Sequence, residues 1–244
     1  MEIGKHLRRY VVSLSRSVDR ALLPLRYRIR KLRFMFTPAS ATRLSAENVP
    51  VHFINLASRP DRLRDTQDEL QRMRLVNWSR FDAIKNDNGA LGCALSHSGV
   101  FEGLQPGETA VMVCEDDIEF LVSPEELREL VQEFLENPAL DVLCVAFNVM
   151  AKGHPISSRL DITSNTQTLA CYVAKASALE LLRDSFSESA RLIQAGKPPG
   201  LVAADQHWKK LQRRALIFAI PRKRAARQRP SFSDIEGQDV SYGV

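Results

Sequence analysis

Short apolar runs alternate with longer segments of helical character over residues 51–147. The predicted strands, rich in β-branched and other apolar residues, are 51–56, 79–84, 109–114 and 140–147. The predicted helices are 60–75, 92–104 and 123–137. Strands that alternate with helices predict an α/β fold, a mostly parallel sheet with helices on both of its faces. Ligands of such sheets bind at the carboxyl ends of the strands.

Local signals indicate where these helices begin. Ser58 is expected to cap the first helix, with Pro60 in its first turn, and Ser123 to cap the third. The segment 86–92, NDNGALG, has the composition of a turn and is expected to precede the second helix.

The positive charge of the chain is concentrated at its start. Residues 1–36 hold ten Lys and Arg against two acids, a net charge of +8, so the rest of the chain carries about −3 of the total of +5. The segment 37–49 is rich in Pro, Ala, Ser and Thr and is a predicted linker. Of the 244 residues, 50–244 then remain as one sizeable domain.

The segment 1–36 is predicted to be a basic amphipathic helical arm. Apolar residues recur in steps of three or four from Leu7 to Phe36, and Arg side chains crowd the other faces. Pro24 is expected to kink or split the helix near residue 23. The pattern favours a helix lying on an anionic membrane surface. Packing on the domain or in a coiled coil is the alternative, whereas nucleic acid is not an expected partner because no reader motif appears.

The chain lacks the sequence marks of a secreted or membrane-spanning protein. No apolar stretch reaches the ~18–20 residues of a spanning helix, and the start lacks the apolar core and cleavage site of a signal peptide. The cysteines form no C-x-x-C pair and are expected to be buried free thiols rather than disulfides or a zinc site. We therefore expect a cytoplasmic protein, peripheral on the inner face of the cytoplasmic membrane.

Three consecutive acids follow the predicted strand 109–114. They are Glu115, Asp116 and Asp117, at the strand end where a ligand site is expected. Carboxylates are the natural ligands of hard cations such as Mg²⁺ and Mn²⁺, and a cation would offset their mutual repulsion. A solvated acidic turn is the alternative, and the three acids alone do not decide between the two.

The motifs around these acids resemble glycosyltransferase family 25, which includes galactosyltransferases of lipopolysaccharide core and lipooligosaccharide synthesis. The family pattern is I-N-L with R-x-x-R, then G-x-x-G-C-x-x-S-H, then a strand ending in E-D-D. The matching residues are Ile54 to Leu56 with Arg59 and Arg62, Gly89 to Cys93 with Ser96 and His97, and Glu115 to Asp117. Later segments, 166–182, 202–208 and 228–237, are also similar to the family, so the resemblance covers about residues 50–237.

The resemblance implies a GT-A-like nucleotide-sugar-binding fold and a transferase activity. The donor would be a UDP-sugar, with UDP-galactose expected, and the cofactor Mn²⁺ or Mg²⁺. The acceptor would be a hydroxyl of a glycolipid or lipopolysaccharide core saccharide, and inversion is the expected stereochemical course. The alternative is a non-catalytic relative that serves as a membrane-tethered binding or scaffold module.

The resemblance also implies roles for particular residues. Asp117 and Glu115 are the metal-ligand candidates, with Glu115 or Asp116 meeting the ribose or the sugar. His207 is a further metal-ligand candidate because it stands two residues from Asp205, and not because of the resemblance. Asp205 is the candidate base for the acceptor hydroxyl. The other donor-binding candidates are Asn55, Arg59, Arg62, Ser96, His97, Ser231 and Ser233. Ser231, Ser233 and Asp234 lie on a late loop that could close over the donor as a lid.

Each of these roles has a structural alternative. Asp205 could cap a helix over 205–213, and His207 could pack beside Trp208. Arg59 and Arg62 could be solvated helix charges, and Ser96 and His97 a hydrogen-bonded structural pair. No motif appears in 150–165, so the sequence does not identify the acceptor.

Overall fold

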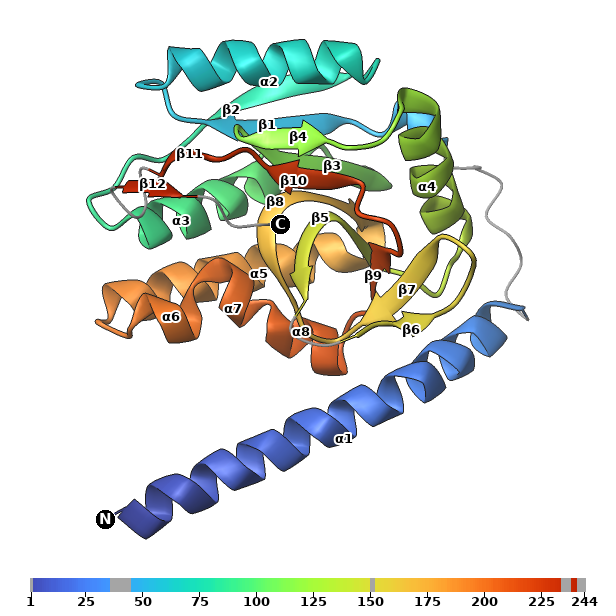
Figure 1. Cartoon of the computed structure of the whole chain (residues 1–244), viewed down its shortest axis with the longest axis vertical. Coiled ribbons are helices and arrows are strands. Elements are labelled where there is room, and N and C mark those ends of the chain that lie inside the picture. Colours follow the sequence, from blue (N-terminus) through green and yellow to red (C-terminus); the bar gives the residue numbers. More distant parts are fainter. Residues whose placement is uncertain (1, 36–44, 150–151, 234–237, 241–244) are drawn as a thin grey trace.

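The computed structural model describes the backbone of residues 2–35, 45–149, 152–233 and 238–240, and the side chains of 16–34, 45–149 and 152–230. Figure 1 shows a central sheet between helices, with one long helix lying along the outside. In the described part of the chain, no helix combines the length and the apolar character needed to cross a membrane.

The central sheet runs in the order β2-β1-β3-β8-β5-β9-β7-β6. Its strands are β1 Val51–Asn55, β2 Trp78–Asp82, β3 Ala110–Glu115, β5 Val142–Val149, β6 His154–Pro155, β7 Leu160–Thr163, β8 Thr166–Lys175 and β9 Phe218–Pro221. Two short strands branch from its interior: β10 Ala226–Gln228 pairs in parallel with β5, and β4 Ile118–Phe120 pairs antiparallel with β10. A separate hairpin pairs β11 Ser231–Ser233 with β12 Gln238–Val240.

The centre of the sheet is mostly parallel in direction. Strands β2, β1 and β3 pair in parallel, and β8 lies antiparallel between β3 and β5. Because β8 opposes both of its neighbours, β5 and its parallel partner β9 run in the same direction as β3. The predicted α/β class is confirmed, with β8 as the one reversed strand among these six.

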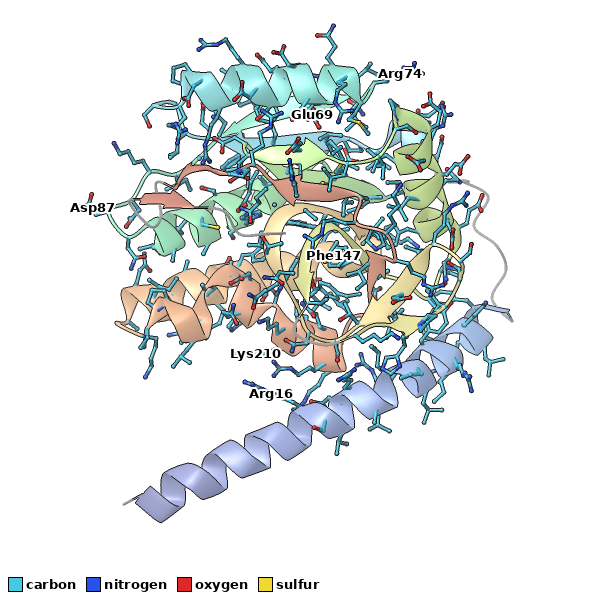
Figure 2. All side chains as sticks on the ribbon, viewed as in Figure 1. Arg16, Glu69, Arg74, Asp87, Phe147 and Lys210 are labelled. Atoms are coloured by element: carbon cyan, nitrogen blue, oxygen red, sulfur yellow. The ribbon has the colours of Figure 1, made fainter. Side chains whose placement is uncertain are left out.

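Helices cover both faces of the sheet, as predicted. The helices are α1 Glu2–Met35, α2 Pro60–Arg72, α3 Gly89–Glu102, α4 Pro124–Glu136, α5 Ala176–Gln194, α6 Pro199–Val202, α7 Ala204–His207 and α8 Lys209–Arg214, with a 3₁₀ turn, η1, at Ala46–Asn48. Alternate residues of β3 enter two apolar clusters. Met112 packs in the cluster that includes α2 and α4, and Val113 in the cluster that includes α3 and α5. In Figure 2, Phe147 lies inside the fold, whereas Arg74 and Asp87 point outward.

The strands predicted from the sequence correspond to β1, β2, β3 and β5, but some helix starts were wrong. Ser123 does cap α4, in a capping box with Glu126. Ser58 does not cap α2, because Arg59 is the N-cap residue and no side chain bonds there. The segment 86–92 is only partly a turn, since Asn88 caps α3 and the helix begins at Gly89.

The second half of α1 packs on the domain. Leu23 and Tyr27 are buried, and Arg30 donates to Asp141 at 2.7 Å through Nη2. The helix continues through Pro24, so it is not split near residue 23. Pro24 costs about 3 kcal/mol in a helix interior, and burial of the neighbouring Leu23 and Tyr27 contributes in the opposite direction.

Candidate functional site

The three acids lie at the carboxyl end of the parallel strands, as the sequence predicted. Glu115 is the last residue of β3, and Asp116 and Asp117 form the turn into β4. Since β8 is antiparallel to β3, the beginning of β8 reaches the same edge, with Cys171 opposite Cys114. The acids therefore face residues that are distant in sequence.

Asp116 has a structural role in the site. Its two carboxylate oxygens accept hydrogen bonds from Asn55 Nδ2 at 2.7 Å and Arg62 Nη1 at 2.8 Å. Thr66 of α2 donates to its backbone carbonyl at 3.0 Å. Burial raises the pKa of Asp116, and Arg62 opposes that rise. Both oxygens are engaged, so Asp116 fixes α2 against the acid turn instead of reaching for a ligand.

Asp117 has one carboxylate oxygen that is open to a ligand. Its Oδ1 atom is buried and has no hydrogen-bond partner among the side chains and backbone that the structure describes. Burial and the nearby Glu115 raise the pKa of Asp117 to about 7, while Arg62, 3.6 Å away, lowers it. A buried oxygen without a partner beside a second carboxylate fits a divalent cation, because a cation would satisfy the oxygen and offset the repulsion.

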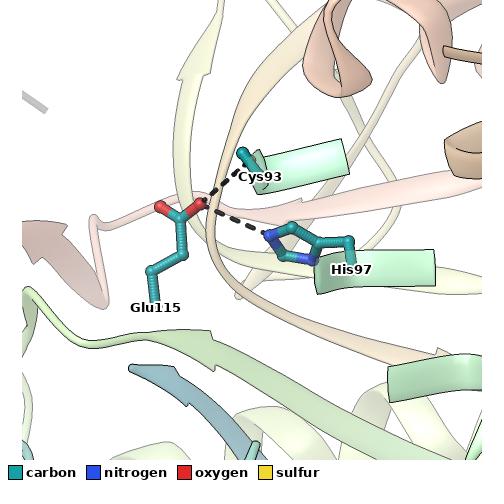
Figure 3. A group of neighbouring side chains, drawn as sticks. All are labelled: Cys93, His97 and Glu115. Atoms are coloured by element: carbon teal, nitrogen blue, oxygen red, sulfur yellow. Dashed lines mark hydrogen bonds and ion pairs between the residues drawn. The ribbon is translucent and has the colours of Figure 1, made fainter. Parts of the chain in front are cut away.

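Glu115 stands at the centre of the site. Its Oε1 lies 3.4 Å from His97 Nε2 and 3.8 Å from Cys93 Sγ, both on α3 (Figure 3). Its Oε2 accepts from Gln228 Nε2 at 3.3 Å. The side chain is 22% exposed, so it remains open to a ligand.

Gln228 at the end of β10 bridges the acids to β8. Its Nε2 lies 3.4 Å from Asp117 Oδ2, in addition to its contact with Glu115. Its Oε1 accepts from Thr168 Oγ1 at 2.8 Å. Thr168 has a φ of 73°, a left-handed conformation that is unusual for a β-branched residue and concentrates at functional sites.

A cavity of about 240 Å³ opens on one side of the acids. Its lining includes the apolar Leu56 and Ile84, the cationic Arg62 and Lys85, and all three acids. Ser96 shapes its wall, because its hydroxyl accepts from Ile84 N at 2.8 Å and donates to Gly92 O at 2.7 Å. This combination suits a ligand with a flat apolar part and an anionic part.

A second cavity, of about 330 Å³, adjoins the first. It is lined by the amides of Asn148, Gln167 and Gln206, together with Thr168 and Asp205. Cys93, Glu115 and Gln228 line both cavities. Among the described residues, no Lys or Arg lines it, so its polar surface favours a neutral ligand rich in hydroxyl groups over an anion.

Asp205 lines the second cavity, but His207 lies elsewhere. The Asp205 carboxylate accepts from Thr168 N at 3.4 Å, and burial raises its pKa. It does not cap a helix over 205–213, since that region forms two short helices and Ala203 is the N-cap of the first. His207 shares a hydrogen bond with Ser185 of α5 at 2.9 Å and lines neither cavity, so the structure does not bring it to the acids.

The other site residues predicted from the sequence either contact the acids indirectly or have side chains that the structure does not describe. Asn55 is buried and positions Asp116, and Arg59 pairs with Asp61 at 2.8 Å. Neither lines the first cavity, whereas Arg62 and His97 do. The backbones of Ser231 and Ser233 belong to the hairpin of β11 and β12, but their side chains and Asp234 lie outside the described residues.

Several residues of the site were not nominated from the sequence, and most of the cavity lining is among them. Cys93, Thr168 and Tyr172 stood in the motifs but carried no assigned role, and Gln228 begins the late segment 228–237. Cys93 was expected only to be a buried thiol. All four cysteines are free, but Cys93 is partly exposed and lines both cavities.

Comparisons with known proteins give weak similarities only. No family model and no curated protein sequence matches the chain. The solved structure of 4-diphosphocytidyl-2C-methyl-D-erythritol synthase from Anaerococcus prevotii is similar at 9% identity and a TM-score of 0.41, over 73% of this chain and 89% of that one. A glycosyltransferase involved in glycosylation of the major capsid of PBCV-1 is similar at 11% identity and a TM-score of 0.36, over 69% of this chain and 91% of that one. Similarity at this level does not assign the chain to a family.

Proposed function

We propose that the protein is a metal-dependent glycosyltransferase that moves a sugar, with galactose expected, from a UDP-sugar to a saccharide hydroxyl. The observation that carries the proposal is the meeting of two chemically different cavities at Glu115 and Gln228. One cavity offers cations and carboxylates, and the other offers neutral amides and a buried acid. The motifs that resemble glycosyltransferase family 25 line both.

The first cavity is suited to the nucleotide donor. Leu56 and Ile84 offer apolar surface to a base, and Arg62 and Lys85 offer positive charge to a diphosphate. Asp117 would hold the cation through its unpartnered Oδ1, with Glu115 as the second carboxylate. A bound Mn²⁺ or Mg²⁺ supplies a Lewis acid that neutralises the charge of the diphosphate as it leaves.

The second cavity is suited to the acceptor saccharide. Asn148, Gln167 and Gln206 offer donors and acceptors for sugar hydroxyl groups. Asp205 is the proposed base, since burial raises its pKa and so increases its capacity to take a proton. As the acceptor oxygen attacks the anomeric carbon on the face opposite the leaving diphosphate, its proton passes to Asp205 and the transfer inverts configuration.

The long helix provides a basis for the proposed contact with an anionic membrane. Val18, Leu22, Leu25, Ile29 and Leu32 are exposed and recur every three or four residues, so they form one apolar stripe. This outward stripe is distinct from Leu23 and Tyr27, which pack on the domain.

The charges beside the stripe favour lipid over a second copy of the helix. Arg28 and Arg33 flank the stripe, and across a parallel helix pair they would place like charges together. Anionic lipid headgroups would instead attract them. A glycolipid acceptor, such as a lipopolysaccharide core, would be presented at such a surface.

A screen of UDP-sugars in Mn²⁺ tests the proposed reaction. We expect one donor, UDP-galactose first among them, to be hydrolysed or transferred, and Asp117→Asn to abolish turnover. Asp68→Asn, an exposed acid of α2, is the matched control and should retain activity. Full turnover in excess EDTA would rule out the metal. A chain that binds no UDP in Mn²⁺ and turns over no donor would instead be the non-catalytic relative.

A further inference from the structure

We propose that Cys93, His97 and Glu115 form a binding site for a thiophilic divalent cation of the zinc class. Cys93 and Glu115 line both cavities and His97 lines the first, and Figure 3 shows the three side chains turned toward one another. It shares Glu115 with the proposed Mn²⁺ or Mg²⁺ position at Asp117 but takes its other ligands from α3, and it does not depend on the proposed transferase reaction.

The distances suit a zinc ion. Glu115 Oε1 lies 3.4 Å from His97 Nε2 and 3.8 Å from Cys93 Sγ, and the ligand atoms of the three residues lie within 4.8 Å of one another. A point equidistant from three atoms so spaced is about 2.4 Å or less from each, against Zn–S of about 2.3 Å and Zn–N or Zn–O of about 2.0–2.2 Å. A tetrahedral ion stands out of the plane of its three protein ligands, so the Cys93 and His97 side chains would draw closer together when the ion binds.

The chemistry of the set favours zinc over magnesium or manganese. A thiolate and an imidazole are ligands for soft and intermediate cations, whereas hard cations prefer oxygen alone. Binding would release the Cys93 thiol proton and leave His97 Nε2 unprotonated, so the cation takes up one thiolate, one neutral imidazole and one carboxylate. With three protein ligands, the fourth position would open into the cavities, as in zinc sites that bind water or substrate.

A buried tyrosine orients the ring of His97 through a hydrogen bond. His97 Nδ1 shares a hydrogen bond with Tyr172 Oη at 3.0 Å, and Tyr172 is fully buried on β8. When His97 Nε2 carries the cation, Nδ1–H would donate to the Tyr172 oxygen, which fixes the ring plane toward Glu115. His97 is also packed against Phe186, with the ring centroids 5.3 Å apart, so its orientation is set before any ion binds.

Glu115 would link the two cation sites. It belongs both to this trio and to the pair with Asp117, so an ion bound by Cys93 and His97 would withdraw Glu115 from the hard-cation pair. We therefore expect Zn²⁺ to compete with Mn²⁺ for the protein, although the two ions take different sets of ligands.

Cobalt absorption spectroscopy tests the site without any sugar donor. Co²⁺ added to the reduced full-length protein should give the near-ultraviolet absorption of a cobalt–thiolate bond and the visible bands of tetrahedral Co²⁺, saturating at one equivalent. One equivalent of Zn²⁺ should remove both. Cys93→Ser should lose the thiolate band, and Cys144→Ala, which changes a buried cysteine that lines neither cavity, should keep it.

A second variant separates ligand loss from misfolding. Tyr172→Phe keeps the ring but removes the hydroxyl, and it should weaken Zn²⁺ by about ten- to a hundredfold in competition with a chromophoric chelator. Unchanged circular dichroism would show that each variant is folded. Absence of a thiolate band in the folded wild type, or an undiminished band in Cys93→Ser, would overturn the proposal. No sugar donor is present in these experiments, so a failed transferase assay would not change what the cobalt spectra or the Zn²⁺ competition show.

Discussion

Gln228 donates a hydrogen bond to the Glu115 carboxylate at 3.3 Å, although 113 residues separate the two in sequence. The contact connects β10, near the end of the chain, to the acid turn after β3. Gln228 also belongs to both cavities, so it stands where the proposed donor and acceptor sites meet.

Gln228→Ala should destabilise the protein, because the side chain that contacts both Glu115 and Asp117 is removed. The substitution removes the contacts to Glu115, Asp117 and Thr168, two of which involve carboxylates. We expect the free energy of unfolding, measured with urea at pH 7, to fall by about 1–2 kcal/mol. Gln71→Ala, at an exposed position of α2, is the control and should stay within about 0.5 kcal/mol of the wild type.

The cation-free protein should lose stability as the pH rises. The pKa of Asp117 is raised from 3.8 to about 7, so between these values the folded state holds a proton that the unfolded state has released. The free energy of unfolding therefore falls between about pH 4 and pH 7, at no more than about 1.4 kcal/mol per pH unit, and levels off above. Urea unfolding in EDTA at pH 5 and pH 7.5 measures the slope, and an equally steep fall in Asp117→Asn would contradict this assignment.

Asp205→Asn should reduce kcat without removing donor binding. A general base contributes about 10²–10⁴-fold, and Asp205 lines the second cavity but not the first. We therefore expect kcat to fall by about a hundredfold or more. The Kd of UDP in Mn²⁺, measured by calorimetry, should stay within about twofold of the wild-type value. Asp184→Asn, on the exposed side of α5, serves as the control. A kcat close to the wild-type value in Asp205→Asn would assign the base elsewhere.

Arg30→Ala should release α1 from the domain. Asp141 is fully buried and pairs with Arg30, with Ser177 and the backbone N–H of Ile217 as its other donors. Removing one partner of a buried pair costs about 3–5 kcal/mol. We expect a loss near the lower end of that range in urea unfolding, together with faster proteolysis within α1. Arg28→Ala, an exposed change on the same helix, should show neither effect.

The exposed stripe of α1 can be tested by vesicle flotation. Replacing Leu22, Leu25 and Leu32 by Ser should abolish binding to anionic vesicles and leave the unfolding free energy nearly unchanged, since all three side chains are exposed. Leu181→Ser, which alters an exposed Leu of α5, should bind as the wild type does. Retained flotation in the triple variant would exclude this stripe as the membrane contact. A loss of self-association in light scattering would point to a second copy as its partner.

The periodicity of the sequence predicted the first half of the fold well. Strong β-branched runs marked β1, β3 and β5, and the Ser123 capping box marked α4. The later strands were not predicted, because short segments such as β9 and β10 acquire their conformation from pairing with strands far away in sequence. The continuity of α1 through Pro24 was not predicted either, because the burial of Leu23 and Tyr27 against the domain cannot be read from local sequence.

The site could be predicted as far as its motifs extend. The run Glu115 to Asp117 placed the acids at a strand end, which the structure confirms. The separate roles of the three acids could not be predicted from the sequence. Only the hydrogen bonds from Asn55 and Arg62 show that Asp116 has a structural role. Likewise, His207 was grouped with the acids from its proximity to Asp205 in sequence, but the short helix α7 directs it toward α5.

Titration calorimetry of UDP in the presence of Mn²⁺ tests most directly whether Asp117 and Glu115 hold a nucleoside diphosphate through a divalent cation. We expect UDP to bind the wild type and Asp68→Asn in Mn²⁺, and to bind neither Asp117→Asn nor the wild type in excess EDTA. Binding of UDP that is equally strong in EDTA, or in folded Asp117→Asn, would contradict the proposed site.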